Sequence, residues 1–363
     1  MKIPLINFKY EQEEFGEIYA DLLNNHVETS QFIGGESVNN FEKNFADFLN
    51  VKNVVSVGNG TDALLVSLEA LQLEKKEVIV PSFSFFATSE AIVKAGLIPV
   101  FVDINRLDCN INTEIIEEHI TNNTCAILPV HLYGNAANMS DIKKIAQTFN
   151  LRIVEDVAQS FGSKYNNKFL GTLGDFGCFS FFPTKTLGAY GDGGAIVTNN
   201  DDLASTARML KNHGAKKKYY NEIFGYNSRL DSIQASILSL KLTKINQWID
   251  QRVKIGNFYD SQFKSIDEIQ LLNNANSTFN YYSIFVLNNL RDNFKSYLDE
   301  QGIANAIYYP KTLPSLPAHN DNRTFPVAEK ACKEVISLPI WPGMSNDQRD
   351  YVVEVTKNFF IDY

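Results

Sequence analysis

The chain has 363 residues, of which 44% are hydrophobic and 21% are charged, a composition typical of a globular protein that buries a large core. This length favours two domains over one or three. The net charge of -9 argues against general nucleic-acid binding, because phosphate backbones are bound by clustered lysine and arginine, and the one basic run, residues 216–218, is too short to reverse that.

The four cysteines, at positions 109, 125, 178 and 332, show no CxxC spacing. This pattern favours reduced cysteines of a cytosolic protein over a disulfide framework or a zinc site. The first residues reach acidic positions before any sustained apolar run, unlike a secretory signal peptide. No stretch approaches the roughly 20 apolar residues of a membrane span. We therefore expect a cytoplasmic protein with no membrane contact and no metal.

Hydrophobic periodicity predicts two N-terminal helices, over residues 11–24 and 38–49, and then an alternation of strands and helices. Such an alternation indicates a largely parallel sheet with helices on both faces. The predicted strands are residues 54–57, 77–80, 98–102, 124–129, 152–154, 176–182 and 194–198, and the helices between them are residues 63–71, 86–95 and 140–149.

The pattern changes near residue 230. The elements expected beyond it are a long helix from about residue 230 toward 263, a strand over 281–287, and helices over 291–300 and from 347. We therefore expect an α/β protein with a large domain over residues 1–235 and a small α+β domain over residues 236–363.

Lys185 is the first candidate catalytic residue. It lies in the segment SFFPTKTLG, residues 180–188, where an apolar strand ends and a proline and small residues follow. A lysine desolvated there would have a lowered pKa, and a neutral amine is the form that makes an imine. For Lys185 taken alone, a surface lysine with its amine in water is the better explanation, since most lysines are exposed.

Two neighbouring motifs change this balance. Asp156 follows an apolar strand, at the edge where open α/β sheets bind ligands, and a carboxylate there can pair with a protonated pyridine nitrogen. A helix N-cap is the alternative role for it. The turn GNGTDA, residues 58–63, can close backbone N–H groups on a phosphate. Its spacing matches neither a dinucleotide fingerprint nor a P-loop, and a simple capped turn is an equal alternative.

Three further candidate side chains lie in or just after the predicted strands of this region. Ser180 is a candidate second phosphate ligand, with a half-buried strand serine as the alternative. Phe85 is a candidate ring that stacks on a pyridine, although core packing is the commoner role of a phenylalanine. His131 has no neighbours at metal-ligand spacing and is better explained as structural.

Together these motifs resemble the DegT/DnrJ/EryC1/StrS family of sugar aminotransferases, which have the aspartate-aminotransferase fold (fold type I). The resemblance covers nearly the whole chain, and several weak motifs in matching order make it specific. The matching segments are FIGG (32–35), FE (41–42), GNGTDAL (58–64), VPS (80–82), EDVAQ (155–159), SFFPTK (180–185), GDGG (191–194), GYNSRLD (225–231) with QA (234–235), and SLP (337–339).

The resemblance implies pyridoxal 5'-phosphate as the cofactor. Lys185 would hold it as a Schiff base and later move a proton between the substrate carbon and the cofactor, a general-base role. Asp156 would pair with the pyridine nitrogen, and Gln159 would approach the ring hydroxyl.

The resemblance also assigns the remaining cofactor contacts. Gly60, Thr61 and Ser180 would hold the phosphate, and Phe85 stands where the family stacks an aromatic ring. Asn227 would reach the phosphate in a neighbouring subunit. This last role implies a homodimer with active sites at the subunit interface.

Some relatives carry histidine in place of the Schiff-base lysine and act as dehydratases, so Lys185 favours amino transfer. The family often has His-Tyr-Pro where this chain has Tyr-Tyr-Pro at residues 308–310. A substrate contact through Tyr308 is therefore an open hypothesis.

Residues 216–220 match a substrate loop of relatives. On that basis we expect Lys217, Lys218 and Tyr219 to contact the diphosphate of a nucleotide sugar. A solvated run of charge is an equal alternative for this segment.

The turn NGTDA, residues 59–63, resembles members that act at C3, whereas 4-aminotransferases often show Ser-Ala or Thr-Ala there. The resemblance therefore favours amino transfer from L-glutamate to a dTDP-3-keto-6-deoxyhexose, for surface glycan synthesis. The alternatives are a 4-aminotransferase acting on a UDP- or dTDP-4-keto sugar, a non-catalytic cofactor-binding regulator and a dinucleotide-dependent dehydrogenase. The intact set of Lys185, Asp156 and Gln159 disfavours the regulator, and the missing fingerprint disfavours the dehydrogenase.

Overall fold

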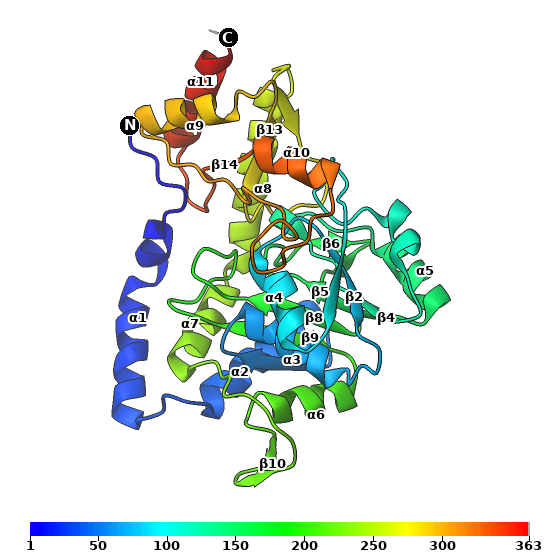
Figure 1. Cartoon of the computed structure of the whole chain (residues 1–363). Coiled ribbons are helices and arrows are strands. Elements are labelled where there is room, and N and C mark those ends of the chain that lie inside the picture. The colour runs from blue at the N-terminus through cyan, green and yellow to red at the C-terminus, as the bar shows by residue number, and fades with distance from the viewer. Residues whose placement is uncertain (362–363) are drawn as a thin grey trace.

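A seven-stranded sheet forms the centre of the computed structural model, which describes residues 1–361 (Figure 1). In spatial order its strands are β1 (Asn53–Val57), β9 (Gly194–Thr198), β8 (Phe176–Ser180), β5 (Arg152–Asp156), β4 (Thr124–Ile127), β2 (Glu77–Pro81) and β3 (Ile98–Val102). Strand β9 runs antiparallel to both of its neighbours, and the pairings from β8 to β3 are all parallel. The predicted α/β fold with a mostly parallel sheet is confirmed.

Helices cover both faces of this sheet. Alternate strand residues point to opposite sides, so Val78 and Val80 join one apolar cluster, with α3, α4 and α6, while Ile79 joins another, with α5. Helices α2 and α7 cover the part of that second face near β1 and β9, and α1 packs outside them. The helices are α1 (Lys9–Thr29), α2 (Gly35–Leu49), α3 (Gly60–Ala70), α4 (Phe86–Lys94), α5 (Met139–Phe149), α6 (Asp201–Leu210) and α7 (Ser232–Leu242).

The C-terminal part is built on a three-stranded antiparallel sheet in the order β12-β13-β14. Its elements are α8 (Ile245–Phe263), β12 (Ile269–Leu271), β13 (Tyr282–Val286), α9 (Arg291–Glu300), α10 (Pro326–Glu334), β14 (Val335–Leu338) and α11 (Asn346–Ile361). Ile3 belongs to the apolar core of this part, because its backbone pairs with Gly302 and Ala304. The N-terminus therefore lies beside the C-terminal elements (Figure 1). The domain boundary at residue 235 remains a prediction.

One predicted element is wrong in form. The long helix expected from residue 230 toward 263 is two helices, α7 and α8, which Thr243 and Lys244 separate. Ile245 and Trp248, at the start of α8, pack in the same cluster as α2 and α7, whereas Ile255 and later residues pack in the C-terminal core. Helix α8 therefore connects the two cores, which continuous helical periodicity alone did not indicate.

Short elements lie between the main ones. They are the 3₁₀ turns η1 (Thr113–Ile115), η2 (Glu117–His119) and η3 (Leu132–Gly134), the hairpin β6 (Lys164–Tyr165) with β7 (Lys168–Phe169), and the hairpin β10 (Ala215–Lys217) with β11 (Tyr220–Asn221). The β10–β11 hairpin projects from the lower end of the molecule in Figure 1. None of the described helices combines the length and apolarity that a bilayer crossing requires.

Candidate active site

A cavity of about 640 Å³ opens at the carboxyl edge of the large sheet. Asp156 ends β5 and Ser180 ends β8, and these neighbouring parallel strands bring both side chains to the same edge. Of the residues predicted from the sequence, those that line the cavity are Gly60, Thr61, Phe85, Asp156, Gln159, Ser180, Lys185 and Tyr308. Four others, Asn227, Lys217, Lys218 and Tyr219, do not line it.

One end of the cavity is formed by the first turn of α3. The Asn59 side chain accepts a hydrogen bond from the Asp62 N–H at 2.8 Å and so caps the helix. Gly60 and Thr61 then present first-turn backbone to the cavity. A Cβ on Gly60 would lie 2.7 Å from the Cβ of Ser180, so only glycine permits this close approach. Free N–H groups beside a serine hydroxyl fit a phosphate group.

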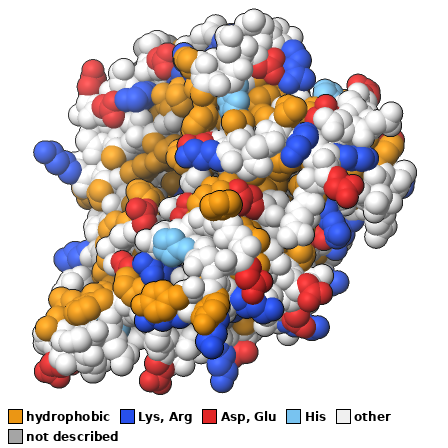
Figure 2. Space-filling view, turned by 60° about the horizontal axis from the view of Figure 1, so that its bottom comes forward, with side chains coloured by type: hydrophobic (Ala, Val, Ile, Leu, Met, Phe, Trp, Pro, Cys, Tyr) orange, Lys and Arg blue, Asp and Glu red, His pale blue; other side chains and the backbone are white. Residues whose placement is uncertain are grey.

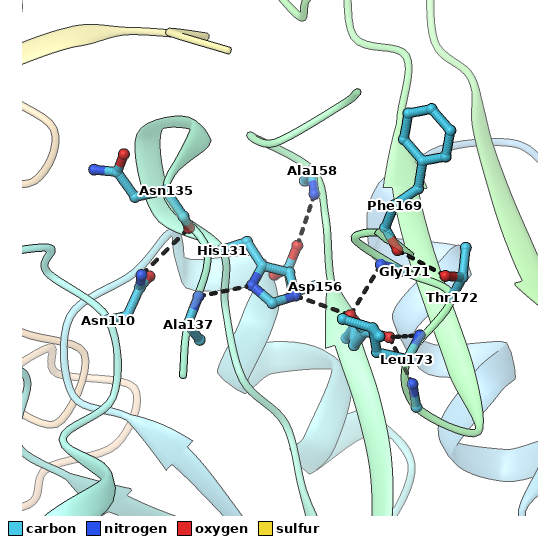
Figure 3. Close-up of polar contacts among 12 residues, drawn as sticks. Asn110, His131, Asn135, Ala137, Asp156, Ala158, Phe169, Gly171, Thr172 and Leu173 are labelled. Atoms are coloured by element: carbon cyan, nitrogen blue, oxygen red, sulfur yellow. Dashed lines mark hydrogen bonds and ion pairs between the residues drawn. The ribbon is translucent and has the colours of Figure 1, made fainter. Parts of the chain in front are cut away.

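Asp156 lies at the bottom of the cavity, 5% exposed. Its Oδ2 accepts a hydrogen bond from the Thr88 hydroxyl at 2.9 Å. Its Oδ1 accepts one from the Ala158 N–H at 3.1 Å (Figure 3). Burial raises the pKa of this carboxyl group, and the two hydrogen bonds and the charge of Lys185 oppose that rise. A protonated ring nitrogen would add the positive charge that such a buried carboxylate favours.

Glu155, the residue before it, holds the end of β5 rigidly. Its carboxylate accepts backbone hydrogen bonds from Gly171, Leu173 and Gly174 at 2.6–2.9 Å. It also accepts one from His131 Nε2 at 3.0 Å. His131 Nδ1 accepts the Ala137 N–H at 3.1 Å, which leaves the proton on Nε2 (Figure 3). His131 is thus a buried structural residue that orients the strand carrying Asp156.

Lys185 reaches the cavity from the loop that follows β8. Its Nζ lies 5.7 Å from the centroid of the Tyr281 ring, and its backbone N–H donates to the Phe182 carbonyl at 2.9 Å. The next residue, Thr186, donates its N–H to Asn280 Oδ1 at 3.1 Å. The loop is therefore anchored to the C-terminal part of the chain at the residue beside Lys185.

Aromatic side chains form the opposite wall. Phe85, 55% exposed, has its ring centroid 5.9 Å from that of Tyr309, and the rings of Tyr281 and Tyr308 lie 4.5 Å apart. Gln159 donates from Nε2 to the Tyr309 hydroxyl at 2.8 Å. Burial raises the pKa of Tyr309 well above its usual value, so this hydroxyl stays protonated. The roles of Tyr281 and Tyr309 were not predicted, because they depend on packing between the two parts of the chain.

Asn227 and the basic segment lie outside the cavity of their own chain. Asn227 forms a β-bridge with Asn212, close to Ser228, whose hydroxyl accepts the Gly58 N–H at 2.9 Å behind the phosphate turn. Lys217, Lys218 and Tyr219 lie on or next to the β10–β11 hairpin, where Tyr219 is 85% exposed. Figure 2 shows the lower end of the molecule, where hydrophobic and basic side chains lie side by side on the surface. Among the described residues, no group of three or more His, Cys, Asp or Glu forms a metal site.

Lys185 and the buried Asp156 line one cavity with the glycine turn at the edge of the sheet, which is the arrangement expected from the resemblance to fold type I aminotransferases. Residues 14–357 match the model of the DegT/DnrJ/EryC1/StrS aminotransferase family. The chain belongs to this family. The predicted enzyme class and its pyridoxal-phosphate cofactor are thereby confirmed.

Individual relatives cover the chain almost completely. The chain is 39% identical to the dTDP-3-amino-3,6-dideoxy-alpha-D-galactopyranose transaminase of Aneurinibacillus thermoaerophilus, over 98% of this chain and 97% of the relative. It is also 39% identical to a "pleiotropic regulatory protein" of Geobacillus stearothermophilus, over 99% of both. Relatives named for UDP- and GDP-linked sugars match as well. The crystal structure of S. venezuelae DesV with a ketimine intermediate superposes with a TM-score of 0.95 at 32% identity, covering 99% of this chain and 98% of that one.

Proposed function

We propose that the protein is a cytoplasmic pyridoxal-phosphate aminotransferase that moves an amino group from L-glutamate to a dTDP-3-keto-6-deoxyhexose, giving the dTDP-3-amino-3,6-dideoxyhexose for surface glycan synthesis. The observation that carries the proposal is that Lys185 and Asp156 line the same cavity as the Gly60 turn. Each of these groups matches one part of the cofactor: its aldehyde, its ring nitrogen and its phosphate.

When bound, the cofactor supplies a carbonyl that takes up the amino group and a protonated ring that withdraws electrons from the reacting carbon. In this account Lys185 anchors the cofactor and then moves the proton at the reacting carbon, as a positioned amine can. Asp156 keeps the ring nitrogen protonated, because its buried carboxylate is favoured by an adjacent positive charge. Phe85 covers one side of the ring, and Gln159, already fixed by Tyr309, orients it.

The sugar and nucleotide are assigned from relatives. The Aneurinibacillus enzyme is named for a dTDP-3-amino-3,6-dideoxy sugar, and DesV aligns over nearly its whole length. We include Tyr308 as a substrate contact, since it lines the cavity and packs against Tyr281, whose ring centroid lies 5.7 Å from Lys185 Nζ.

We further propose that the active unit is a homodimer. Asn227, Lys217 and Lys218 are outside the cavity of their own chain. Close to the two lysines in sequence, Tyr220 and Phe224 are 67% and 100% exposed. Exposed aromatic side chains of this kind are typical of protein interfaces. In a dimer the hairpin of one subunit would bring its lysines to the diphosphate bound by the other.

The second candidate is a 4-aminotransferase or a UDP-sugar enzyme of the same family. The relatives named for UDP- and GDP-linked sugars support a nucleotide other than dTDP. The UDP-sugar relative is itself named a 3-aminotransferase, so it supports a different nucleotide and not reaction at C4. The residues that hold the cofactor do not distinguish the second candidate from the main proposal, because both reactions use the same cofactor chemistry.

A two-stage experiment tests the proposal. Glutamate added to the purified holoenzyme is expected to bleach the visible absorbance of the cofactor imine. Products are then analysed after incubation with dTDP-3-keto-6-deoxy, dTDP-4-keto-6-deoxy and UDP-4-keto sugars. Amination of the 3-keto substrate alone supports the proposal, and amination of a 4-keto substrate alone supports the second candidate. Failure of glutamate to bleach the band would contradict glutamate as the donor.

A further inference from the structure

A buried ion pair lies beneath the loop that carries Lys185. Lys241, on α7, is 1% exposed, and Glu11, on α1, is 3% exposed. Their Nζ and Oε2 atoms lie 2.6 Å apart. A buried ion pair adds little net stability over apolar side chains of the same size, because both charges lose their hydration. Its presence here is better explained by the other groups that the two charges bind.

Both charges contact the Lys185 loop. Lys241 Nζ donates a hydrogen bond to the Gly188 carbonyl at 2.7 Å and lies 4.0 Å from the centroid of the Tyr190 ring. The Tyr190 hydroxyl donates to Glu11 Oε2 at 2.6 Å. Helices α1 and α7 therefore hold the loop through one ammonium and one carboxylate.

Gly188 connects this contact to Lys185. A Cβ on Gly188 would overlap the carbonyl of Pro183, so the two residues touch backbone to backbone, with Lys185 between them. The Ala189 N–H closes the same loop on the Phe181 carbonyl at 2.7 Å. A displacement of the Gly188 carbonyl would therefore move the short segment on which Lys185 stands.

We propose that Lys241 is a positioning residue for Lys185. With Glu11 as its counter-ion, its ammonium fixes the Gly188 carbonyl and thereby the reach of Lys185 into the cavity. Burial lowers the pKa of Lys241 and the charge of Glu11 raises it again, so the charged form of the lysine depends on its partner. The inference rests on the proposed role of Lys185 in amino transfer.

The test uses the double variant Glu11→Gln/Lys241→Met, which removes both charges and approximately keeps the side-chain volumes. A single Lys241→Met variant would leave Glu11 buried without its partner and could fail to fold. The matched control is Glu14→Gln/Lys244→Met. It removes an ion pair of the same length, 2.6 Å, between α1 and Lys244, the residue just before α8, and that pair is partly exposed.

Two measurements are made on each protein. Hydrogen exchange of residues 181–190, in protein freed of cofactor, reports the rigidity of the loop. Loss of the charged hydrogen bond is expected to speed exchange of the Lys185 and Ala189 amides about tenfold. Steady-state kinetics of the holoenzyme should show kcat lowered about tenfold with KM for the nucleotide sugar unchanged, because a mispositioned amine affects the chemical step.

The outcomes test the positioning role of Lys241 separately from the proposed role of Lys185 in amino transfer. Exchange and kcat equal to those of the control would overturn the positioning role, and so would faster exchange with unchanged kcat. Failure of the proposed function is recognised independently, as retention of turnover in Lys185→Ala. The exchange measurement needs no cofactor and stays valid in that case.

Discussion

The cofactor end of the cavity and the β10–β11 hairpin differ in burial, in hydrogen bonding and in how closely their residues pack. At the cofactor end, Asp156 is buried and accepts two hydrogen bonds, and Gly60 touches Ser180 so closely that no side chain fits. On the hairpin, Tyr219 and Tyr220 are 85% and 67% exposed. Most residues of the first region come together within one chain, with Asn227 of a second subunit as the proposed exception, whereas the side chains of the second region are exposed at the surface.

We relate this difference to two roles: the cofactor end would carry out the chemical step, and the hairpin would bind the nucleotide sugar. Groups that must be held to within a fraction of an ångström lie on the rigid sheet edge, where packing and hydrogen bonds fix them. Groups that bind a flexible diphosphate can lie on a solvent-exposed hairpin, because charge attraction tolerates loose geometry. Substitutions at the first region should therefore change kcat or cofactor affinity, and those at the second should change KM.

The largest effect is expected for Lys185→Ala. It removes the anchor of the cofactor and the proton-transferring amine together, so turnover should fall by at least about 10⁴-fold, the upper range for general acid–base catalysis. Product formation is followed by chromatography of the nucleotide sugars. The control is Lys94→Ala, which removes a second lysine of the same cavity wall that is paired with Glu90 at 2.9 Å. An equal loss of turnover in Lys185→Ala and Lys94→Ala would show that the effect is not specific to Lys185.

The second-largest effect is expected for Asp156→Asn. The amide keeps the shape, and its one oxygen can still accept the Ala158 N–H while its NH2 group donates to the Thr88 oxygen, but it loses the charge that holds the ring nitrogen protonated. A fall in kcat of about 10²–10³-fold is expected, as for removal of one preorganised electrostatic group. Unchanged kcat in steady-state assays would mean that this carboxylate has only a structural role.

Gly60→Ala tests the phosphate end. The added methyl would meet Ser180 Cβ at 2.7 Å, whereas the same change at Gly58 meets its nearest atom at 3.2 Å. We expect the affinity for pyridoxal phosphate to fall about tenfold in Gly60→Ala, the effect of about 1.4 kcal/mol of overpacking, and less in Gly58→Ala. Cofactor titrations followed by fluorescence measure both. A larger loss at Gly58 would contradict the assigned contact.

The double change Lys217→Ala/Lys218→Ala tests the hairpin. Exposed charges contribute weakly and are screened by salt, so KM for the nucleotide sugar should rise only about three- to tenfold at low salt and less at high salt. The cofactor absorbance and kcat should stay unchanged. The matched control is Lys75→Ala/Lys76→Ala, another pair of adjacent exposed lysines. No change in KM would leave the segment as a solvated run of charge.

The smallest effect concerns His319, whose Nε2 is hydrogen-bonded to the Ser89 hydroxyl on α4 at 2.8 Å. Burial lowers the pKa of this histidine. The folded protein therefore binds its proton less readily than the unfolded chain, so stability is lost as pH falls below about 6.5. Thermal unfolding between about pH 7.5 and 5.5 should show a slightly smaller decrease of Tm for His319→Gln. An identical decrease in both proteins would exclude this contribution.

Much of the fold was predictable because local signals agree with the tertiary structure. The strands over Ile98–Val102 and Gly194–Thr198 and the helix over Arg291–Glu300 have the expected bounds. Among the longer elements, four were missed: helix α6, strands β12 and β14, whose short apolar runs lack a distinct period, and helix α10, which begins at Pro326. The two short hairpins and the 3₁₀ turns were not predicted either.

Only part of the candidate site was predictable from such local signals. Asp156 and Ser180 are the last residues of strands, Lys185 lies in the loop after one of them, and parallel strands bring their ends together. The places of Tyr281 and Tyr309 depend on how the C-terminal part packs on the sheet, and the Lys241–Glu11 pair joins helices that are distant in sequence. No periodicity encodes such contacts, so sequence reasoning could not find them.

The most direct test of the central claim is chemical mapping of the cofactor anchor. The holoenzyme is reduced with borohydride, digested and sequenced by mass spectrometry. The structure predicts one phosphopyridoxyl group, on Lys185, and none on Lys94, Lys217 or Lys218. A label on another lysine, or no label on a protein that retains aminotransferase activity, would contradict the account.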